Sequence, residues 1–565
     1  MVDGSEPGAE GPHPEARGSG SVAIWAPVAV SPAAESECVM SDYVIVGAGS
    51  AGCVLAARLS EDPNVTVTLI EAGPPDDRDM IHVPAMWVKL WQTEVDWDLH
   101  TMPEEHCAGR TLALPRGRTL GGTSSLNAMV YIRGNRLDYD QWAADGATGW
   151  SYDDLLPYFL RAENNERGAD AWHATGGPLN VADSRSRNPM AQAFIDAAIA
   201  AGHAPNEDFN AAEQDGFGWY QLTQRDGMRC SAAVAYLHPI LDRPNLTVES
   251  FAEVSRIVFD GTRAVGVAFR RLGQETIVPV DGEVIVCGGA YHSPNVLMHS
   301  GVGPGELLTA YGVPVVLDQP QVGANLQDHA QVLLTWNSDE PVSLLNAATP
   351  EALEEFETHR TGPLASNGPE SGGFVRTREG LEAPDVQYHL FPNAAHPTLT
   401  DPSEHGMLVT ACVLKPHSTG TVSIASSEPT AKPVIRHGYY GDERDMQTLV
   451  EGLRTALDIA ESDALRPYAA RPFHGPAGDR EADLRSYVAA NTQTVYHPTS
   501  SCAIGKVVDN DLRVMGLDGV RVCDASVMPT VVRGNTNAPT IAIAERAADL
   551  IRGRTPTTGH EPAPV

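Results

Sequence analysis

The sequence predicts an α/β protein with a Rossmann-type unit near its N-terminus, and three stretches support this prediction. Residues 42–73 run from a short apolar segment through a glycine-rich turn and a helical segment to a second apolar segment. Residues 283–287 form another apolar strand, followed by small residues and a helix. Residues 245–270 alternate polar and apolar positions around an Asp-Gly pair, which is typical of a β-hairpin. At 565 residues, the chain is long enough for two or more domains.

The first stretch predicts one complete β-α-β unit. Residues 43–46 and 65–70 suit buried parallel strands, and residues 53–59 suit the helix between them. The motif G-x-G-x-x-G is made by Gly47, Gly49 and Gly52, with the small residues Ala48, Ser50 and Ala51 between them. Such glycines turn the chain tightly and expose N–H groups at the positive end of a helix, where a pyrophosphate fits.

Glu71 completes the pattern. It lies 19 residues beyond Gly52, where a Rossmann unit places the acid that holds a ribose hydroxyl. The alternative is a structural glycine-rich turn without a ligand, since the chain has 52 glycines. The agreement of strand, helix, second strand and acid favours a dinucleotide, although the motif alone does not separate FAD from NAD.

The charge of the chain argues against two classes of partner. The net charge is −34 and the isoelectric point is about 4.8. Nucleic acid and anionic membranes both repel such a surface, so neither is predicted as a partner. No apolar run reaches transmembrane length, and no transmembrane segment is predicted.

The cysteines and the N-terminal tail favour a cytoplasmic location. None of the eight cysteines forms C-x-x-C or a metal-ligand spacing, and several lie in apolar runs, so buried thiols and no metal site are predicted. Residues 1–39 lack the basic segment of a secretory signal, and we expect them and residues 554–565 to be disordered. We also expect Met40 to be the native start.

Two further stretches suggest a cofactor cavity. Residues 121–125 are small and precede Asn127, and such a loop lets backbone amides approach a flat polar ring. Three tryptophans, Trp87, Trp91 and Trp97, either line a cavity or pack in a core, and the sequence does not decide between these uses.

Over residues 42–553 the chain resembles the glucose-methanol-choline (GMC) flavin oxidoreductase family, nearest to its bacterial choline dehydrogenase and alcohol dehydrogenase branch. The resemblance is carried by the glycine motif, the 121–130 loop, the run GGAYHSPNVLMHSGVGP at residues 288–304, and NLQDH at residues 325–329. It implies FAD at the glycine motif and the 121–130 loop against its isoalloxazine ring. Some choline oxidases carry a histidine in this loop that bonds covalently to flavin. Leu126 occupies that place here, so we expect non-covalent FAD.

Motif and resemblance together predict which residues contact FAD. They are Gly47, Gly49, Ser50, Ala51, Gly52, Glu71, Ala72, Arg118, Gly121, Gly122, Ser125, Asn127, Ala128, Met129, Val130, Val254, Gly288, Asp524, Ala525, Asn535, Pro539 and Thr540. For Asp524, a turn or N-cap role is compatible with this contact.

The resemblance also divides the chain into two interleaved domains. The FAD-binding domain is expected at residues 40–150, 217–330 and 491–553. Residues 151–216 and 331–490 are expected to form an α+β substrate domain, an antiparallel sheet covered by helices on one side.

His497 and Asn535 are the predicted catalytic pair. Oxidising an alcohol requires a base for the hydroxyl proton and an acceptor for the carbon-bound hydride. Histidine has the pKa range of such a base, and an asparagine N–H stabilises an alkoxide without competing for the proton. One histidine among 19 would more often be structural, but YHPTS and GNTNAPT match the family's pair, with His497 as base and Asn535 beside it.

The substrate and electron acceptor are less determined. Glu370 resembles the carboxylate that attracts the ammonium group in choline-oxidising relatives, and Tyr496 resembles an aromatic partner of that site. A similar glutamate occurs in relatives that oxidise uncharged alcohols, so the expected substrate is an uncharged primary alcohol or a choline-like amino alcohol, oxidised to an aldehyde. Oxygen, a quinone or another carrier could accept the electrons. A lyase or photodecarboxylase on the same fold, or a non-catalytic flavin-binding protein, are the alternatives.

Overall fold

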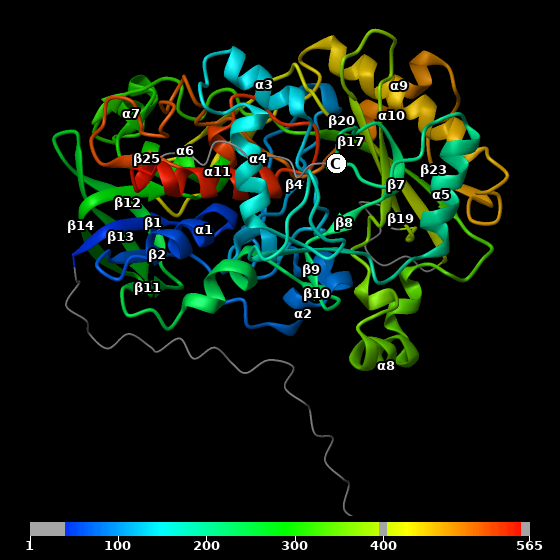
Figure 1. The fold of residues 1–565 in the computed structure, drawn as a ribbon. Helices are drawn as coiled ribbons and strands as arrows, with labels where there is room; N and C mark the ends of the chain where they lie inside the picture. The colour runs from blue at the N-terminus through cyan, green and yellow to red at the C-terminus, as the bar shows by residue number, and fades with distance from the viewer. Residues whose placement is uncertain (1–39, 395–403, 555–565) are drawn as a thin grey trace, which may run out of the picture. The chain divides into compact units, whose positions relative to one another are not determined.

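The computed structural model describes residues 40–394 and 404–554, which all belong to one unit by their mutual contacts (Figure 1). The predicted tails, residues 1–39 and 554–565, lie outside the described residues apart from Arg554. Two seven-stranded sheets organise the described part of the chain.

The first sheet has the strand order β11-β2-β1-β14-β13-β12, with β25 also pairing with β14. Its strands are β1 (Ser41–Val46), β2 (Val67–Ile70), β11 (Leu246–Glu249), β12 (Glu253–Asp260), β13 (Arg263–Arg271), β14 (Gln274–Val286) and β25 (Val520–Val522). β11, β2, β1, β14 and β25 run parallel, so their carboxyl ends meet at one edge. That edge is where open α/β sheets bind ligands.

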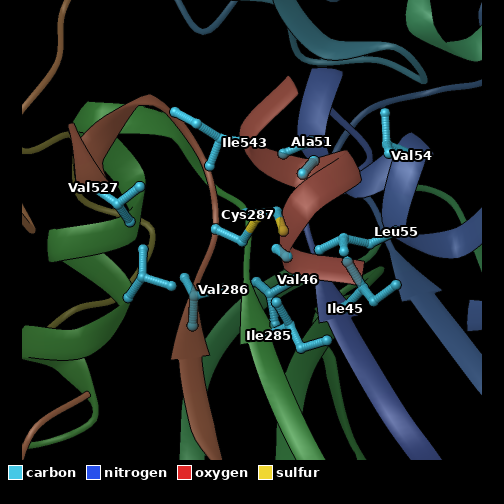
Figure 2. Packing of buried hydrophobic residues seen from close by; sticks show 14 of the residues in the cluster. Ile45, Val46, Ala51, Val54, Leu55, Ile285, Val286, Cys287, Val527 and Ile543 are labelled. Carbon is cyan, nitrogen blue, oxygen red and sulfur yellow. The ribbon is translucent and has the colours of Figure 1, made fainter. Parts of the chain in front are cut away.

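The predicted β-α-β unit is present as β1, α1 (Ser50–Leu59) and β2. The third glycine of the motif serves packing: a Cβ on Gly52 would lie 1.9 Å from the carbonyl oxygen of Gly47. Only glycine lets the helix start so close to the strand. α11 (Asn537–Ile551) packs beside α1, and Figure 2 shows Ile543 of α11 with Leu55 of α1 over the strand residues Val46 and Val286.

β14 links two kinds of pairing. Its first half, from Gln274 to Pro279, pairs antiparallel with β13, and its second half pairs parallel with β1. β12 and β13 form the predicted hairpin, with Asp260 opposite Arg263 across the turn.

The second sheet has the order β23-β17-β20-β19-β18-β7, with β24 also pairing with β17, and its pairs are antiparallel. Its strands are β7 (Gly216–Trp219), β17 (Ala330–Asn337), β18 (Ser371–Val375), β19 (Val386–Phe391), β20 (Gly406–Val413), β23 (Arg471–His474) and β24 (Gln493–Thr494). Helices α5 (Pro189–Ala200) and α9 (Glu443–Ala460) contact it, and α10 (Glu481–Asn491) packs on α9 (Figure 1).

The two faces of this sheet differ in chemistry. Along β19, Val386, Tyr388 and Leu390 join the apolar cluster that includes residues of α5 and α9. The alternate residues Gln387 and His389 are buried on the other face. This is the predicted antiparallel sheet with helices on one side, and its polar face is free to build a site.

The remaining α-helices and the strands outside the two seven-stranded sheets follow in chain order. The helices are α2 (Asp79–His82), α3 (Arg136–Ala144), α4 (Tyr152–Ala162), α6 (Gly289–His299), α7 (Gly305–Ala310) and α8 (Pro350–His359). The strands are β3 (Leu99–His100), β4 (Ala113–Leu114), β5 (Glu163–Asn165), β6 (Leu179–Asp183), β8 (Gln221–Leu222), β9 (Gln224–Arg225), β10 (Met228–Arg229), β15 (Val302–Gly303), β16 (Leu317–Asp318), β21 (Thr421–Ser423) and β22 (Val434–Arg436).

Three details bear on the remaining predictions. β7 and β24, which begin near the expected domain boundaries at 217 and 491, pair in the second sheet, and the exact domain boundaries stay a prediction. The seven cysteines of the described residues are buried, as predicted. Among the helices of residues 40–394 and 404–554, none is long and apolar enough to cross a membrane.

Candidate active site

A cavity of about 290 Å³ joins the carboxyl edge of the first sheet to the polar face of the second. At the first sheet its lining includes Gly47, Glu71 and Asp524, each following the end of a parallel strand. At the second sheet its lining includes Gln331 and His389. The site is therefore assembled from both ends of the described chain.

Three helices begin at this cavity. The first residues of α1, α6 and α11 line it; α1 and α11 have no side-chain cap, whereas the first N–H group of α6, that of Gly289, donates to Asp524 Oδ2. Ser50 Oγ donates a hydrogen bond of 2.7 Å to Asn537 Oδ1 and so ties α1 to α11. The uncapped N-termini of α1 and α11 make a site for an anion, and they fit the pyrophosphate of a dinucleotide.

Glu71 faces the same cavity as a hydrogen-bond acceptor. The backbone N–H groups of Ala48 and Gly73 each donate to one of its carboxylate oxygens at 2.9 Å. Burial raises the pKa of this carboxyl to about 7, although both hydrogen bonds favour the charged form. Its position at the end of β2 fits the ribose-binding acid of a Rossmann unit.

Asp524 organises the backbone around the dinucleotide end. It accepts hydrogen bonds from the Gly289 N–H at 2.9 Å, the Ser293 hydroxyl at 2.5 Å and the Ser526 N–H at 2.7 Å. It thus caps the short helix Ala525–Val527, as the N-cap alternative predicted, and still lines the cavity.

The predicted catalytic pair is brought together. Asn535 Nδ2 lies 3.2 Å from His497 Nε2, and both residues line the cavity. His497 Nδ1 lies 3.0 Å from His329 Nδ1, and His329 Nε2 lies 3.0 Å from the carbonyl oxygen of Leu414. Because a carbonyl only accepts, His329 carries its proton on Nε2 and accepts at Nδ1. His497 therefore donates from Nδ1, which leaves the lone pair of Nε2 beside Asn535.

Neighbouring groups hold this geometry. Gln387 Nε2 donates to Asn535 Oδ1 at 3.2 Å, so the amide of Asn535 turns its Nδ2 toward His497. The Asp328 carboxylate accepts a hydrogen bond of 2.8 Å from the backbone N–H of His497. Tyr496 has a positive φ of 66°, which is uncommon for a bulky residue, and Arg116 Nη2 holds its carbonyl at 2.6 Å.

The electrostatic surroundings keep His497 neutral. Burial lowers the pKa of His497 well below its ordinary value, and the neighbouring His329, His389 and Arg116 lower it further. At neutral pH its Nε2 is thus an unprotonated acceptor, which is the state that a general base needs.

Most predicted cofactor residues line this cavity. They are Gly47, Gly49, Ser50, Ala51, Glu71, Ala72, Gly122, Asn127, Ala128, Met129, Val130, Val254, Gly288, Asp524, Ala525, Asn535 and Thr540. The predicted residues outside the lining are Gly52, Arg118, Gly121, Ser125 and Pro539, together with Glu370 of the substrate prediction.

The residues outside the lining have structural partners. Ser125 Oγ donates to the Leu120 carbonyl at 2.7 Å, and a Cβ on Gly121 would lie 2.3 Å from that same Oγ. Arg118 packs on the ring of Trp97 with 5.0 Å to its centroid, so it supports the wall rather than forming it.

Glu370 lies outside the cavity lining, and the ammonium-binding role expected for it stays a prediction. Its side chain is fully buried and accepts hydrogen bonds from the Ser366 hydroxyl at 2.6 Å and the Asn188 N–H at 2.8 Å. Burial raises the pKa of this carboxyl. A carboxylate held in this way supports the chain around Pro369, which lines the cavity in its place.

Sequence reasoning missed several lining residues. Gln331, His389 and Phe391 lie on strands of the second sheet, and polar residues at alternate positions of apolar strands could have pointed to them. His292 stacks against Trp97 with ring centroids 4.1 Å apart. Trp97 and the other two tryptophans of the undecided group line the cavity, which settles that alternative.

Comparison with known proteins identifies the family of the chain. The family model for GMC oxidoreductases matches residues 41–331 and 416–544. The chain is 42% identical to mouse "Choline dehydrogenase, mitochondrial", covering 90% of this chain and 89% of the relative. It is 39% identical to "Alcohol dehydrogenase [acceptor]" of Pseudomonas putida, covering 91% and 96%. The solved pyridoxine 4-oxidase from Mesorbium loti superposes with a TM-score of 0.84 at 32% identity, covering 91% and 100%.

These similarities confirm the predicted fold class and FAD as the cofactor. They also confirm the predicted class of enzyme. The chain belongs to the GMC oxidoreductase family and is an FAD-dependent alcohol oxidoreductase.

Proposed function

We propose that this enzyme oxidises a primary alcohol to an aldehyde, with His497 as the base and Asn535 as the group that stabilises the alkoxide. The observation that carries this proposal is the 3.2 Å approach of Asn535 Nδ2 to His497 Nε2 at the wall of the cavity. FAD, when bound, accepts the hydride at N5. An alcohol hydroxyl placed between the two side chains would give its proton to Nε2 and accept a hydrogen bond from Nδ2.

His329 supports this role by fixing the tautomer. The Leu414 carbonyl holds the proton of His329 on Nε2, so His497 must donate its own N–H toward His329. The opposite tautomer of His497 would place two lone pairs 3.0 Å apart and present an N–H to the substrate. The chain of hydrogen bonds therefore keeps the base ready before the alcohol arrives.

We propose an uncharged primary alcohol as the substrate. The carboxylates that line the cavity, Glu71, Glu253 and Asp524, lie in or follow strands of the first sheet. The Asp328 carboxylate, which contacts the backbone of His497, is not among the lining residues. The guanidinium of Arg116 lies close enough to lower the pKa of His497. The charge of Arg116, which also lines the cavity, favours a developing alkoxide and disfavours a cationic substrate.

A choline-like alcohol is the second candidate, favoured by the aromatic side of the cavity. The rings of Trp87 and Trp91 lie 5.3 Å apart and those of Trp91 and Tyr496 lie 5.4 Å apart, edge to face. Such ring faces can hold a quaternary ammonium group without a carboxylate. The names of the mouse and Pseudomonas relatives divide between the same two candidates.

Choline and its neutral isostere 3,3-dimethylbutan-1-ol separate the two candidates, because they differ in charge and hardly in shape. We expect the neutral alcohol to bleach the flavin under anaerobic conditions with a kcat/KM at least about tenfold above that of choline. A preference for choline, lost in Trp91→Leu, would establish the second candidate. The same assay with oxygen identifies the acceptor, and failure of every primary alcohol to bleach the flavin would contradict the proposed reaction.

We further propose that FAD is bound without a covalent link. Leu126, which has no nucleophilic atom, lines the cavity where some choline oxidases carry the linking histidine. Acid precipitation should release the yellow colour into the supernatant, and colour retained in the pellet would contradict the proposal.

A cytoplasmic location also stays a prediction, because the name of the mouse relative places that protein in mitochondria. Cell fractionation tests this location.

A further inference from the structure

Arg229 is a buried cation behind the loop that contains Asn127. Its side chain is 1% exposed. The guanidinium donates to the carbonyl oxygens of Ile81 at 2.7 Å, Ser124 at 3.1 Å and Asn127 at 2.7 Å, and to Asn127 Oδ1 at 2.9 Å. Each of these acceptors is neutral.

No carboxylate of residues 40–394 or 404–554 forms an ion pair with Arg229. Nη2 is buried and has no hydrogen-bond partner among the same residues. Burial lowers the pKa of Arg229 to about 9, so the group is still charged at neutral pH. An unpaired buried charge is costly for folding, and its presence calls for a compensating role.

Asn127 connects this charge to the cavity. Its Oδ1 accepts from both Arg229 Nη1 and the Met129 N–H, the latter at 3.0 Å. Asn127 lines the cavity. Because Oδ1 already accepts these two hydrogen bonds, Nδ2 is the polar atom of the amide that is left to face a ligand in the cavity. The orientation of this amide therefore depends on Arg229.

The loop is held from the same segment by a second contact. Ser124 Oγ accepts from the Ala232 N–H at 2.8 Å and donates to the Gly121 carbonyl at 2.6 Å. The segment from Arg229 to Ala232 thus holds the loop at Ser124 and Asn127. Only Arg229 brings a charge to this contact.

We propose that Arg229 is a positioning residue for the isoalloxazine ring of FAD. It turns the Asn127 amide so that an N–H faces the ring, and it supplies a fixed positive charge that offsets the negative charge gained on reduction. The proposal deepens the proposed function, because it rests on the placement of the 121–130 loop against the ring. A charge acting through the protein interior changes an equilibrium by about tenfold or more.

Arg229→Met removes the charge and keeps the approximate volume of the side chain, and Arg229→Lys keeps the charge. The matched control is Arg225→Met in the adjacent strand β9, where Arg225 is exposed and donates to the Pro178 carbonyl. Each holoenzyme is titrated with sulfite, which adds to the flavin as an anion, and its midpoint potential is measured by spectroelectrochemistry.

In Arg229→Met we expect the sulfite Kd to rise about tenfold and the midpoint potential to fall by about 30 mV, the shift that a tenfold change produces in a two-electron couple. Arg229→Lys should recover most of both shifts, and Arg225→Met should match the unmodified enzyme. Unchanged sulfite affinity and potential in Arg229→Met would overturn the proposal.

Asn127→Asp keeps the test decisive if Arg229→Met does not retain FAD. The new carboxylate would neutralise Arg229 within the existing 2.9 Å contact, so the sulfite Kd should again rise about tenfold or more, and an unchanged Kd would overturn the proposal. Neither measurement uses alcohol turnover. Inactivity toward every alcohol would therefore overturn the proposed function, while the sulfite affinity and the midpoint potential would still test the role of Arg229.

Discussion

The two sheets build their shares of the cavity in different ways. The first sheet offers mainly backbone, namely glycines and helix N-termini placed where parallel strands end, together with the carboxylates of Glu71, Glu253 and Asp524. The second sheet offers side chains, with Gln331 and His389 projecting from the faces of antiparallel strands. Cofactor binding thus depends on close approach of the chain, whereas the substrate environment depends on which side chains strand pairing brings to one face.

This difference predicts how each half responds to substitution. In the first sheet, one added methyl group should destroy the site, since the atoms in contact are backbone atoms that cannot move aside. In the second sheet, the fold should tolerate polar substitutions and the chemistry should change in graded steps.

The largest effect is expected for Gly52→Ala. Its methyl group would lie 1.9 Å from the Gly47 carbonyl oxygen, so we expect protein without bound FAD, measured by the flavin-to-protein absorbance ratio and by thermal unfolding. The control is Gly475→Ala, whose methyl group would meet Leu334 at an ordinary 3.7 Å. Full FAD content in Gly52→Ala would contradict the backbone-built description of this half.

His497→Ala should lower the rate of flavin reduction by about 10²-fold or more, the typical contribution of an acid or base, while FAD remains bound. Stopped-flow absorbance with a saturating primary alcohol measures this rate. His359→Ala, at the exposed end of α8, should leave it unchanged. A rate in His497→Ala equal to that of the unmodified enzyme would rule out the role as base.

Glu71 should make the FAD-free protein less stable as the pH rises. The pKa of its carboxyl is about 7 in the folded protein, against 4.5 for an ordinary glutamate. Between pH 4.5 and pH 7 the folded protein therefore keeps a proton on Glu71 that the unfolded chain releases. The free energy of unfolding should fall by up to about 3 kcal/mol from pH 4.5 to above pH 7, relative to Glu71→Gln. Denaturant unfolding at pH 5 and pH 8 measures this difference, and the exposed Glu382→Gln should not reproduce it.

The smallest effect is expected for Gln387→Leu, which tests the second sheet. Loss of the 3.2 Å hydrogen bond to Asn535 Oδ1 frees the Asn535 amide to turn, and we expect kcat to fall by about tenfold, roughly 1.4 kcal/mol, with FAD content intact. Gln192→Leu, at an exposed position of α5, is the control. A drop in FAD content as large as the drop in kcat would show that the two halves are not separable in this way.

The β-α-β unit and its glycine motif could be predicted from the residues, because they depend on short-range periodicity and on a spacing set by one strand and one helix. FAD and the pairing of His497 with Asn535 were expected from the resemblance to the family. The antiparallel second sheet was also expected from that resemblance.

Which side chains share the cavity depends on the three-dimensional arrangement of the strands. Glu370 resembled a substrate carboxylate in the sequence, but its side chain is fully buried and held by Ser366 and Asn188. Conversely, no pattern in the sequence assigned a role to the side chains of His329, Gln387 or Arg229, and their contacts reach residues far away in the chain. Strand order and the direction of each side chain arise from long-range pairing, and no local pattern encodes the tautomer of His497 or the unpaired charge behind Asn127.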